Sequence, residues 1–149
     1  MYKHILIPTD GSTLSRRAAI AGVALAQAIG ARVTGLFAAP AATPFVYRDL
    51  LPVGYVTPAK HAALIKEAAA KHLAVIEQAA KKAGVPCDVD CITDDYPATA
   101  ILAQAKRRKC DLIFMASHGR RGLKGLLLGS ETQKVLTGSS IPVLIHRDR

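Results

Sequence analysis

The residues with the clearest chemical potential stand near the end of the chain, in the stretch ASHGRRGLKGLLLGSETQ at positions 116–133. Gly119 is followed by nine residues and then by Gly129 and Ser130. Glycine lets backbone N–H groups turn toward an anion without obstruction by a Cβ atom, and a helix N-terminus adds a partial positive charge. Hydroxyls at Ser130 and Thr132 are further donors. The spacing suits a phosphate-binding loop, and it suits equally a strand-to-helix turn whose glycines serve geometry alone.

Two common nucleotide-binding motifs are absent from the chain. No GxGxxG occurs, and Lys124 stands five residues before Gly129 without forming GxxxxGK[ST]. Arg120, Arg121 and Lys124 are cations inside the glycine stretch, where they can supply charge to a phosphate or remain solvated at a helix start. Phosphate binding would therefore rest mainly on backbone and hydroxyl donors.

His118 is the residue of this stretch that most invites a catalytic role. No carboxylate stands in an obvious position to orient its ring, and neither Ser117 nor Ser130 has an evident partner base. A general base needs such geometry before its pKa matters. Asp10, the other candidate carboxylate, stands alone among small and apolar neighbours. We therefore expect a binding protein rather than an enzyme, in which slow nucleotide hydrolysis would be incidental.

The elements that must position these residues alternate between strand and helix patterns. Ser12 or Thr13 is a natural N-cap for the first helix, and Gly30 suits its end. The alternation predicts an α/β fold with a five-stranded, mainly parallel sheet and helices on both faces. We expect strands within 3–10, 31–39, 86–94, 110–119 and 141–147, and helices within 11–30, 58–84, 96–109 and 126–139. The strongest helix, at 58–84, has its apolar stripe at Ala62, Ile65, Ala69, Leu73, Ile76 and Ala80.

Two chemically suited segments fall at the carboxyl ends of predicted strands: PTDGS at 8–12 and ASHGRRG at 116–122. In an open parallel sheet, ligands bind at such ends, where the order of the strands reverses. If the strand order is 3-2-1-4-5, the first and fourth strands are neighbours and both segments line one crevice. Asp10 can then accept hydrogen bonds from a ribose hydroxyl or an adenine amine while the glycine stretch approaches the phosphates.

The composition favours a single domain over residues 1–149. Half of the residues are hydrophobic, with four tyrosines, three phenylalanines and no tryptophan, which suits helices packed on a sheet. The N-terminus lacks the order of a signal peptide, and no apolar run reaches the ~18–20 residues of a membrane span, so we expect a cytoplasmic protein without membrane contact. Cys87, Cys91 and Cys110 lack CxxC spacing and predict neither a disulfide framework nor a metal site.

The formal net charge of +9 makes an anionic partner chemically suitable, whether a nucleotide, a nucleic acid or a lipid headgroup. The basic residues are spread along the chain, without a concentrated stripe or interleaved aromatic residues. Nucleic-acid binding is therefore not expected.

Two of the predicted strands have the character of sheet edges. The pattern at 86–94 alternates between apolar and polar residues, which suggests one partly exposed face. The last strand contains Pro142, which cannot donate to a ladder. Because soluble proteins rarely leave an apolar edge open, we expect a homodimer through the last strand, at Ile141, Pro142, Val143, Leu144 and Ile145.

Three segments resemble the universal stress protein family: HILIPTDGS at 4–12, DLIFMASHGRRGLKGLLLGSETQKVL at 111–136 and IPVLI at 141–145. The resemblance runs the length of the chain. Nucleotide-binding members of that family carry G-x-x-G, nine residues and then G-[ST], and this chain fits with Ala116 in place of the first glycine. The resemblance implies a Rossmann-like three-layer α/β sandwich of the adenine nucleotide alpha hydrolase type, commonly a homodimer.

The function that the resemblance implies is the binding of ATP or AMP by a regulatory protein of the stress response. In that interpretation Pro8, Thr9 and Asp10 contact adenine and ribose, Ala38 contributes backbone to adenine, and any Mg²⁺ is held through the phosphates. The phosphates are assigned to Gly119, Gly129, Ser130 and the Glu131 backbone, and the candidate site also includes Met115, Ala116, Ser117, His118, Arg120, Gly122 and Thr132.

A second class within the family lacks the motif and binds no nucleotide, and Ala116 gives weight to that alternative. An added Cβ atom costs little where φ is negative, but it can crowd a closely bound phosphate. The alternative is a nucleotide-free dimer that recruits a protein partner through its dimer surface or through the long loop at 39–57, which contains Tyr47 and Tyr55. We favour retained nucleotide binding because both halves of the site are otherwise present.

Overall fold

The computed structural model describes residues 1–40, 57–119 and 128–148. Within them, five parallel strands form one sheet in the order β3-β2-β1-β4-β5, which confirms the predicted fold class and strand order. The strands are β1 (His4–Thr9), β2 (Arg32–Ala39), β3 (Cys87–Thr93), β4 (Leu112–Ala116) and β5 (Val143–His146). The helices are α1 (Thr13–Ile29), α2 (Pro58–Ala83), α3 (Pro97–Arg107) and α4 (Ser130–Gly138).

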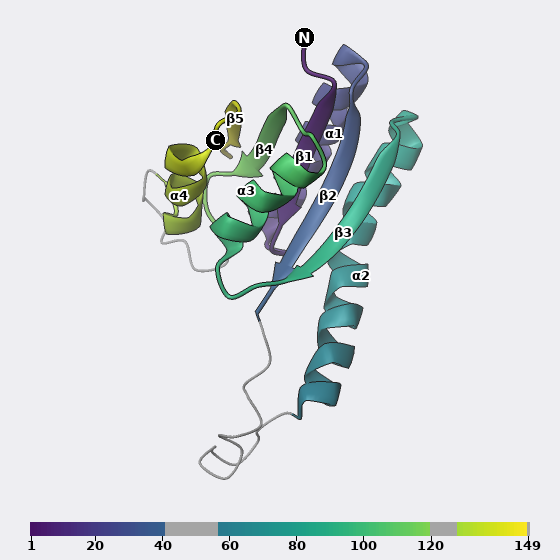
Figure 1. Cartoon of the computed structure of the whole chain (residues 1–149). Helices are drawn as coiled ribbons and strands as arrows, with labels where there is room; N and C mark the ends of the chain where they lie inside the picture. The colour runs from purple at the N-terminus through teal and green to yellow at the C-terminus, as the bar shows by residue number, and fades with distance from the viewer. Residues whose placement is uncertain (41–56, 120–127, 149) are drawn as a thin grey trace.

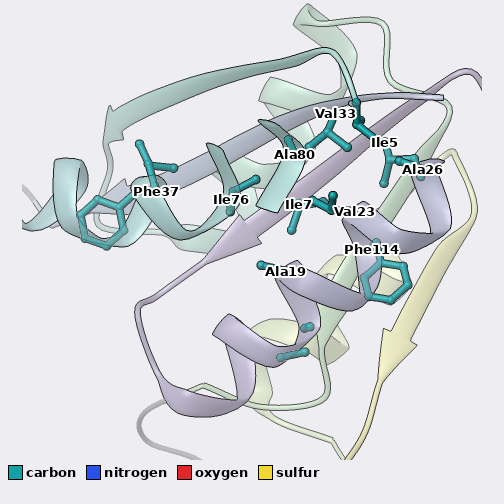
Figure 2. Packing of buried hydrophobic residues seen from close by; sticks show 14 of the residues in the cluster. Ile5, Ile7, Ala19, Val23, Ala26, Val33, Phe37, Ile76, Ala80 and Phe114 are labelled. Atoms are coloured by element: carbon teal, nitrogen blue, oxygen red, sulfur yellow. The ribbon is translucent and has the colours of Figure 1, made fainter. Parts of the chain in front are cut away.

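The sheet is buried on both sides, because α1 and α2 cover one face and α3 and α4 cover the other (Figure 1). Alternate residues of a strand point to opposite faces. In β1, Ile5 and Ile7 belong to the core under α1 and α2, and Leu6 belongs to the core under α3 and α4. Figure 2 shows the first of these cores, which includes Val23 of α1 and Ile76 of α2. Cover on both faces explains why β1 is an unbroken apolar run.

Helix α2 follows its predicted apolar stripe mainly in its second half. Ala69, Leu73, Ile76 and Ala80 are buried, whereas Ala62 is exposed. The helix has 26 residues and β2 has 8, which correspond to lengths of roughly 39 Å and 26 Å. The first turns of α2 therefore extend past the ends of the strands, as Figure 1 shows.

The structure corrects two predicted boundaries. Helix α4 begins at Ser130 and not within 126–129, because Gly129 is the N-cap, with an extended backbone at φ −69° and ψ 155°. Pro142 stands immediately before β5 and not inside it, and its carbonyl accepts a hydrogen bond from the Ile113 N–H at 3.0 Å. The predicted edge positions of β3 and β5 are confirmed.

No helix in the described ranges is long and apolar enough to cross a membrane. The cysteines are free thiols, with Cys110 buried, Cys87 half-buried and Cys91 exposed. Burial raises the pKa of both Cys87 and Cys110 to about 11, so these two thiols stay protonated at neutral pH.

A charged group ties the edge strand β3 to α3. The Asp90 carboxylate, 15% exposed, accepts hydrogen bonds from Arg108 Nε at 2.8 Å and Nη2 at 2.5 Å. The buried side chain of Gln104 also donates to Asp90. The hydrogen bond from Arg108 lowers the pKa of Asp90 and outweighs burial, which raises it.

We expect Asp90→Asn to lower the free energy of unfolding by about 1.5–3 kcal/mol at neutral pH, the range for hydrogen bonds to charged groups. The folded pKa of Asp90 lies below its unfolded value, which is about 3.9. Its contribution is therefore complete above that pH and is lost as the pH falls through the folded pKa, so the variant should show a flatter pH dependence in acid. Urea unfolding at pH values from about 2 to 7 measures both effects.

Asp88→Asn is the matched control for this experiment. The Asp88 side chain is 60% exposed and lies 4.0 Å from Arg108, so its loss should change stability little. Equal destabilisation by the two substitutions would contradict a special contribution from Asp90.

Candidate functional site

The strands β1 and β4 pair with each other only over their first residues and separate before their carboxyl ends. β1 pairs with β2 from His4 to Thr9, but its pairing with β4 covers Ile5 and Leu6. Pro8 follows this short ladder and has no N–H to donate. Because β2 and β4 flank β1 on opposite sides, the order of the strands reverses here. The carboxyl ends of β1 and β4 are thus the switch point at which open parallel sheets bind ligands.

The turn between β1 and α1 is held by its own side chains. The Thr9 hydroxyl lies 3.0 Å from the Ser15 hydroxyl and accepts a hydrogen bond from the Gly11 N–H at 3.1 Å. The Oδ1 atom of Asp10 accepts one from the Ser12 N–H at 2.9 Å. Thr9 is 7% exposed, so its side chain is committed to the turn and offers little to a ligand. These bonds hold the Asp10 carboxylate in a defined place at the end of β1.

Gly119, in the segment that follows β4, lies directly against Asp10. A Cβ atom at position 119 would overlap the Oδ2 atom of Asp10, so any other residue would displace the carboxylate. The structure therefore brings the segments 8–12 and 116–119 together, as the predicted strand order requires. Gly119 is exposed and Asp10 is half-buried, so this contact stands at the surface of the switch point.

Ala116, at the end of β4, directs its methyl group into the core. It is 7% exposed and packs in the cluster under α1 and α2, whereas its neighbour Met115 packs in the cluster under α3 and α4. Among the described non-glycine residues, Lys109 alone has a positive φ, so Ala116 is free of left-handed strain. The added methyl group fills core space. What Ala116 presents outside the core is its backbone.

Gly129, the N-cap of α4, is tightly packed. Its N–H donates to the Ser117 carbonyl at 2.8 Å, and a Cβ atom there would stand 3.1 Å from the Cα and Cβ atoms of His118. Ser117 is 3% exposed, its N–H donates to the His146 carbonyl at 2.9 Å, and its hydroxyl lies 3.2 Å from Nδ1 of His118. Gly129 and Ser117 thus hold the end of β4 against α4, and the Gly129 N–H is already used.

Two other predicted site residues, Thr132 and Glu131, connect α4 to neighbouring elements. The Thr132 hydroxyl is buried and donates to the Ala116 carbonyl at 3.1 Å. The Glu131 carboxylate accepts the Ala98 N–H at 3.0 Å in the first turn of α3, where the N-cap residue Tyr96 makes no side-chain cap. Glu131 also bonds Lys134 at 2.8 Å, and this hydrogen bond lowers the pKa of Glu131. No local pattern of residues indicates this cap, because donor and acceptor belong to different helices.

The N-terminus of α4 is the part of the site suited to an anion. The first N–H groups of a helix have no acceptor within it, and the N-cap Gly129 has no side chain to supply one. Ser130 stands at the first helical position, with its hydroxyl beside these donors. Because Gly129 is bonded to Ser117 and packed on His118, this helix start is held close to the segment that carries Gly119.

The remaining predicted site residues are placed as follows. Pro8 in β1 and Ala38 in β2 are half-buried near the carboxyl edge of the sheet. Arg120 and Gly122, as well as Arg121 and Lys124, lie outside the described residues. The same is true of Tyr47, Tyr55 and the rest of 41–56.

Sequence reasoning missed His72 of α2. Its ring lies against Gly11, where a Cβ atom would overlap it, and its centroid is 5.3 Å from that of the Phe37 ring. No pattern along α2 distinguishes this histidine from a solvent-facing one.

Two grooves of about 320 and 310 Å³ lie elsewhere. One lies between α2 and the carboxyl end of β3, and the other lies at the amino ends of β1, β2 and β3. No three His, Cys, Asp or Glu side chains of the described residues gather as a metal site.

A model of the Universal stress protein family matches residues 1–147. The chain is 32% identical over 147 residues to the "Universal stress protein in QAH/OAS sulfhydrylase 3'region" of Thermus aquaticus, covering 99% of this chain and 100% of the relative. It is 31% identical over 150 residues to Universal stress protein MJ0531 of Methanocaldococcus jannaschii, covering 97% of this chain and 82% of the relative.

Solved structures share the whole fold. The hypothetical protein MJ0577 has a TM-score of 0.79 at 26% identity, covering 100% of this chain and 98% of its own. A universal stress protein in complex with cAMP has a TM-score of 0.66 at 23% identity, with 99% of each chain covered. The universal stress protein from Archaeoglobus fulgidus in complex with dAMP has a TM-score of 0.65 at 17% identity, with 98% of each chain covered. For these last two, the likeness shows the fold alone.

Replacing Glu131 by alanine should lower the free energy of unfolding by about 1 kcal/mol, because α3 loses the acceptor for its first turn. Lys134→Ala keeps the Ala98 contact and removes an ion pair whose lysine side chain is 62% exposed, so a loss below about 0.5 kcal/mol is expected. Urea unfolding compares the two variants. If Lys134→Ala destabilises the protein as much as Glu131→Ala, the ion pair and not the cap is the contribution of Glu131.

Proposed function

Because this chain belongs to the universal stress protein family, we propose that it binds an adenine nucleotide, ATP or AMP, at the switch point between β1 and β4. Nucleotide occupancy would then be the signal that a regulatory protein of the stress response passes on. The cytoplasm is the compartment in which such a protein meets ATP and AMP, and we place it there.

The contact between Gly119 and Asp10 is the observation that carries this proposal. A glycine without room for a Cβ atom, pressed against a carboxylate at a strand end, joins the two halves of the site. A carboxylate at this place can accept hydrogen bonds from ribose hydroxyls, while the backbone donors at the start of α4 bind the phosphates. The nucleoside would therefore lie toward β1 and β2, near Pro8 and Ala38, and the phosphates toward α4.

The start of α4 would hold the phosphates. Its first N–H groups and the Ser130 hydroxyl are donors, and the helix dipole favours negative charge at this end. A divalent cation such as Mg²⁺ would bind through the phosphates, since the described residues form no cluster of metal ligands. The arrangement of His118 and Ser117, which lie 3.2 Å apart at Nδ1 and Oγ, lacks a described carboxylate partner for general-base catalysis. We therefore propose binding without dedicated turnover.

The fold is one that accommodates adenine nucleotides, since two proteins that share it were solved with cAMP and dAMP. The support specific to this chain comes from its own residues. Ala116 packs its methyl group into the core, so the one departure from the family's glycine pattern adds no bulk outside it.

A nucleotide-free interaction module is the second candidate, and one observation favours it. The Gly129 N–H and the Thr132 hydroxyl are already bonded, to the carbonyls of Ser117 and Ala116. Two donors that the glycine pattern offers to phosphates are therefore used within the protein. In this candidate the start of α4 binds no phosphate, and partner binding is the function.

We also propose that two copies of the chain pair through β5. The strand is an edge of the sheet, and Leu144 is 40% exposed, whereas Val143 and Ile145 pack against the core under α3 and α4. An apolar edge strand is a ready template for another chain, and a second copy would cover it.

Native mass spectrometry of freshly purified protein, followed by calorimetric titration with ATP and AMP, tests nucleotide binding. Gly119→Ala should raise Kd by at least about tenfold, a loss of about 1.4 kcal/mol, because its Cβ atom displaces Asp10. Gly138→Ala is the matched control, since its Cβ atom at the other end of α4 would meet the side chain of Leu102. Absence of binding by the wild-type protein, or equal affinity of the two variants, would overturn the proposal and favour the interaction module.

Leu144→Lys should convert the dimer to a monomer, because a charge at the centre of the paired edge opposes burial. Leu64→Lys is the control, since Leu64 is 49% exposed on α2, away from β5. Sedimentation velocity measures the oligomeric state. A wild-type monomer, or a dimer that survives Leu144→Lys, would exclude pairing through β5.

A further inference from the structure

His72 of α2 is a titratable side chain that contacts the turn at Gly11 and that neither the glycine motif nor the strand ends account for. A Cβ atom at Gly11 would overlap three ring atoms of His72: Cε1, Nδ1 and Nε2. The face of the ring, near Cε1, therefore lies over Gly11. Gly11 also has a φ of +76°, a conformation that other residues rarely adopt. The turn and the ring are fitted to each other without spare room.

The His72 ring also packs against an aromatic ring of the sheet. Its centroid lies 5.3 Å from that of Phe37 in β2, with the ring planes tilted by 52°. On α2 its neighbours Ala69, Leu73 and Ile76 are buried in the core, which anchors this part of the helix to the sheet. His72 thus stands on a rigid element and presses on a turn that is part of a candidate site. Such support is what keeps binding groups in place.

Gly11 connects the His72 ring to the centre of the site. Gly11 follows Asp10, whose Oδ1 atom caps the same turn at Ser12 and whose Oδ2 atom stands against Gly119. The series His72, Gly11, Asp10 and Gly119 contains two places where even one added carbon atom does not fit. Because Gly11 joins the ring contact to Asp10, we expect a shift of the ring to move the turn that carries the carboxylate.

We propose that His72 is a positioning residue of the nucleotide site, whose ring sets the place of the Asp10 carboxylate relative to Gly119. The inference rests on the proposed nucleotide binding for its functional consequence, and on the observed contacts for its structural part. It gives the site a third wall from α2, in addition to the strand ends and the start of α4.

The test compares three variants on one helix. His72→Ala removes the ring, His72→Phe keeps a ring of similar size against Phe37, and Leu73→Ala makes a cavity in the core without touching the turn. In nucleotide-free protein, His72→Ala should shift the backbone amide NMR signals of Gly11, Ser12 and Gly119, and His72→Phe should shift them less. For ATP and AMP, His72→Ala should raise Kd by about tenfold, and His72→Phe should restore most of the affinity.

The outcomes separate positioning from simple stabilisation. Leu73→Ala should lower the thermal midpoint as much as His72→Ala or more, yet leave Kd unchanged at temperatures where both variants are folded. If His72→Ala leaves the Gly119 signal in place, or if His72→Phe fails to restore affinity, the inference is overturned. If the wild-type protein binds neither nucleotide, the proposed function fails, and the inference is decided by the Gly119 signal of the nucleotide-free protein alone.

Discussion

The central strand β1 is buried on both faces, and the arrangement of the rest of the molecule depends on that constraint. Ile5, Leu6 and Ile7 have no exposed surface. Full burial of such side chains contributes roughly 1.5–3 kcal/mol each, provided that a layer covers each face of the sheet. Four helices supply the two layers, and each helix must cross back over the sheet before the next parallel strand. Between His4 and Thr9 at its two ends, β1 is apolar, so the polar groups that a ligand can reach begin beyond the strand, at Asp10.

The polar groups at the amino ends of the strands differ in their role from those at the carboxyl ends. At the amino end of β1, the Asp111 carboxylate accepts the N–H groups of Lys3 and His4 at 2.8 and 2.9 Å, and the His4 ring lies 2.8 Å from the Thr34 hydroxyl. Burial raises the pKa of Asp111, but the backbone hydrogen bonds outweigh it and the net shift is downward. These contacts tie the amino end of β1 to β2 and to the residue before β4. The carboxyl edge holds its polar groups at the switch point, where they are available to a ligand.

The two glycines of the family pattern, Gly119 and Gly129, have different structural roles. Gly119 allows the carboxylate of Asp10 to approach the end of β4, whereas Gly129 packs on His118 and donates to Ser117. Thr132 and Glu131 also tie elements together, one to the Ala116 carbonyl and one to the first turn of α3. Several residues of a motif with phosphate-binding spacing are thus used for contacts within the protein. The donors at the start of α4 remain the part best suited to an anion.

The fold class, the strand order that the family resemblance carries, and the stretches from which the site is built were all predictable from the amino-acid sequence. Local burial leaves a periodic trace along the chain, and turn residues mark where it stops, so these features can be read without a structure. Even so, Ala62 and the start of α4 were misplaced, because a stripe does not reveal where a helix outruns its sheet or where a glycine cap begins. Three contacts were visible only in the folded protein: Gly119 with Asp10, Glu131 with the first turn of α3, and His72 with Gly11. Each of these contacts joins side chains from different elements, and their fit depends on the packing of whole layers, which no local pattern of residues encodes.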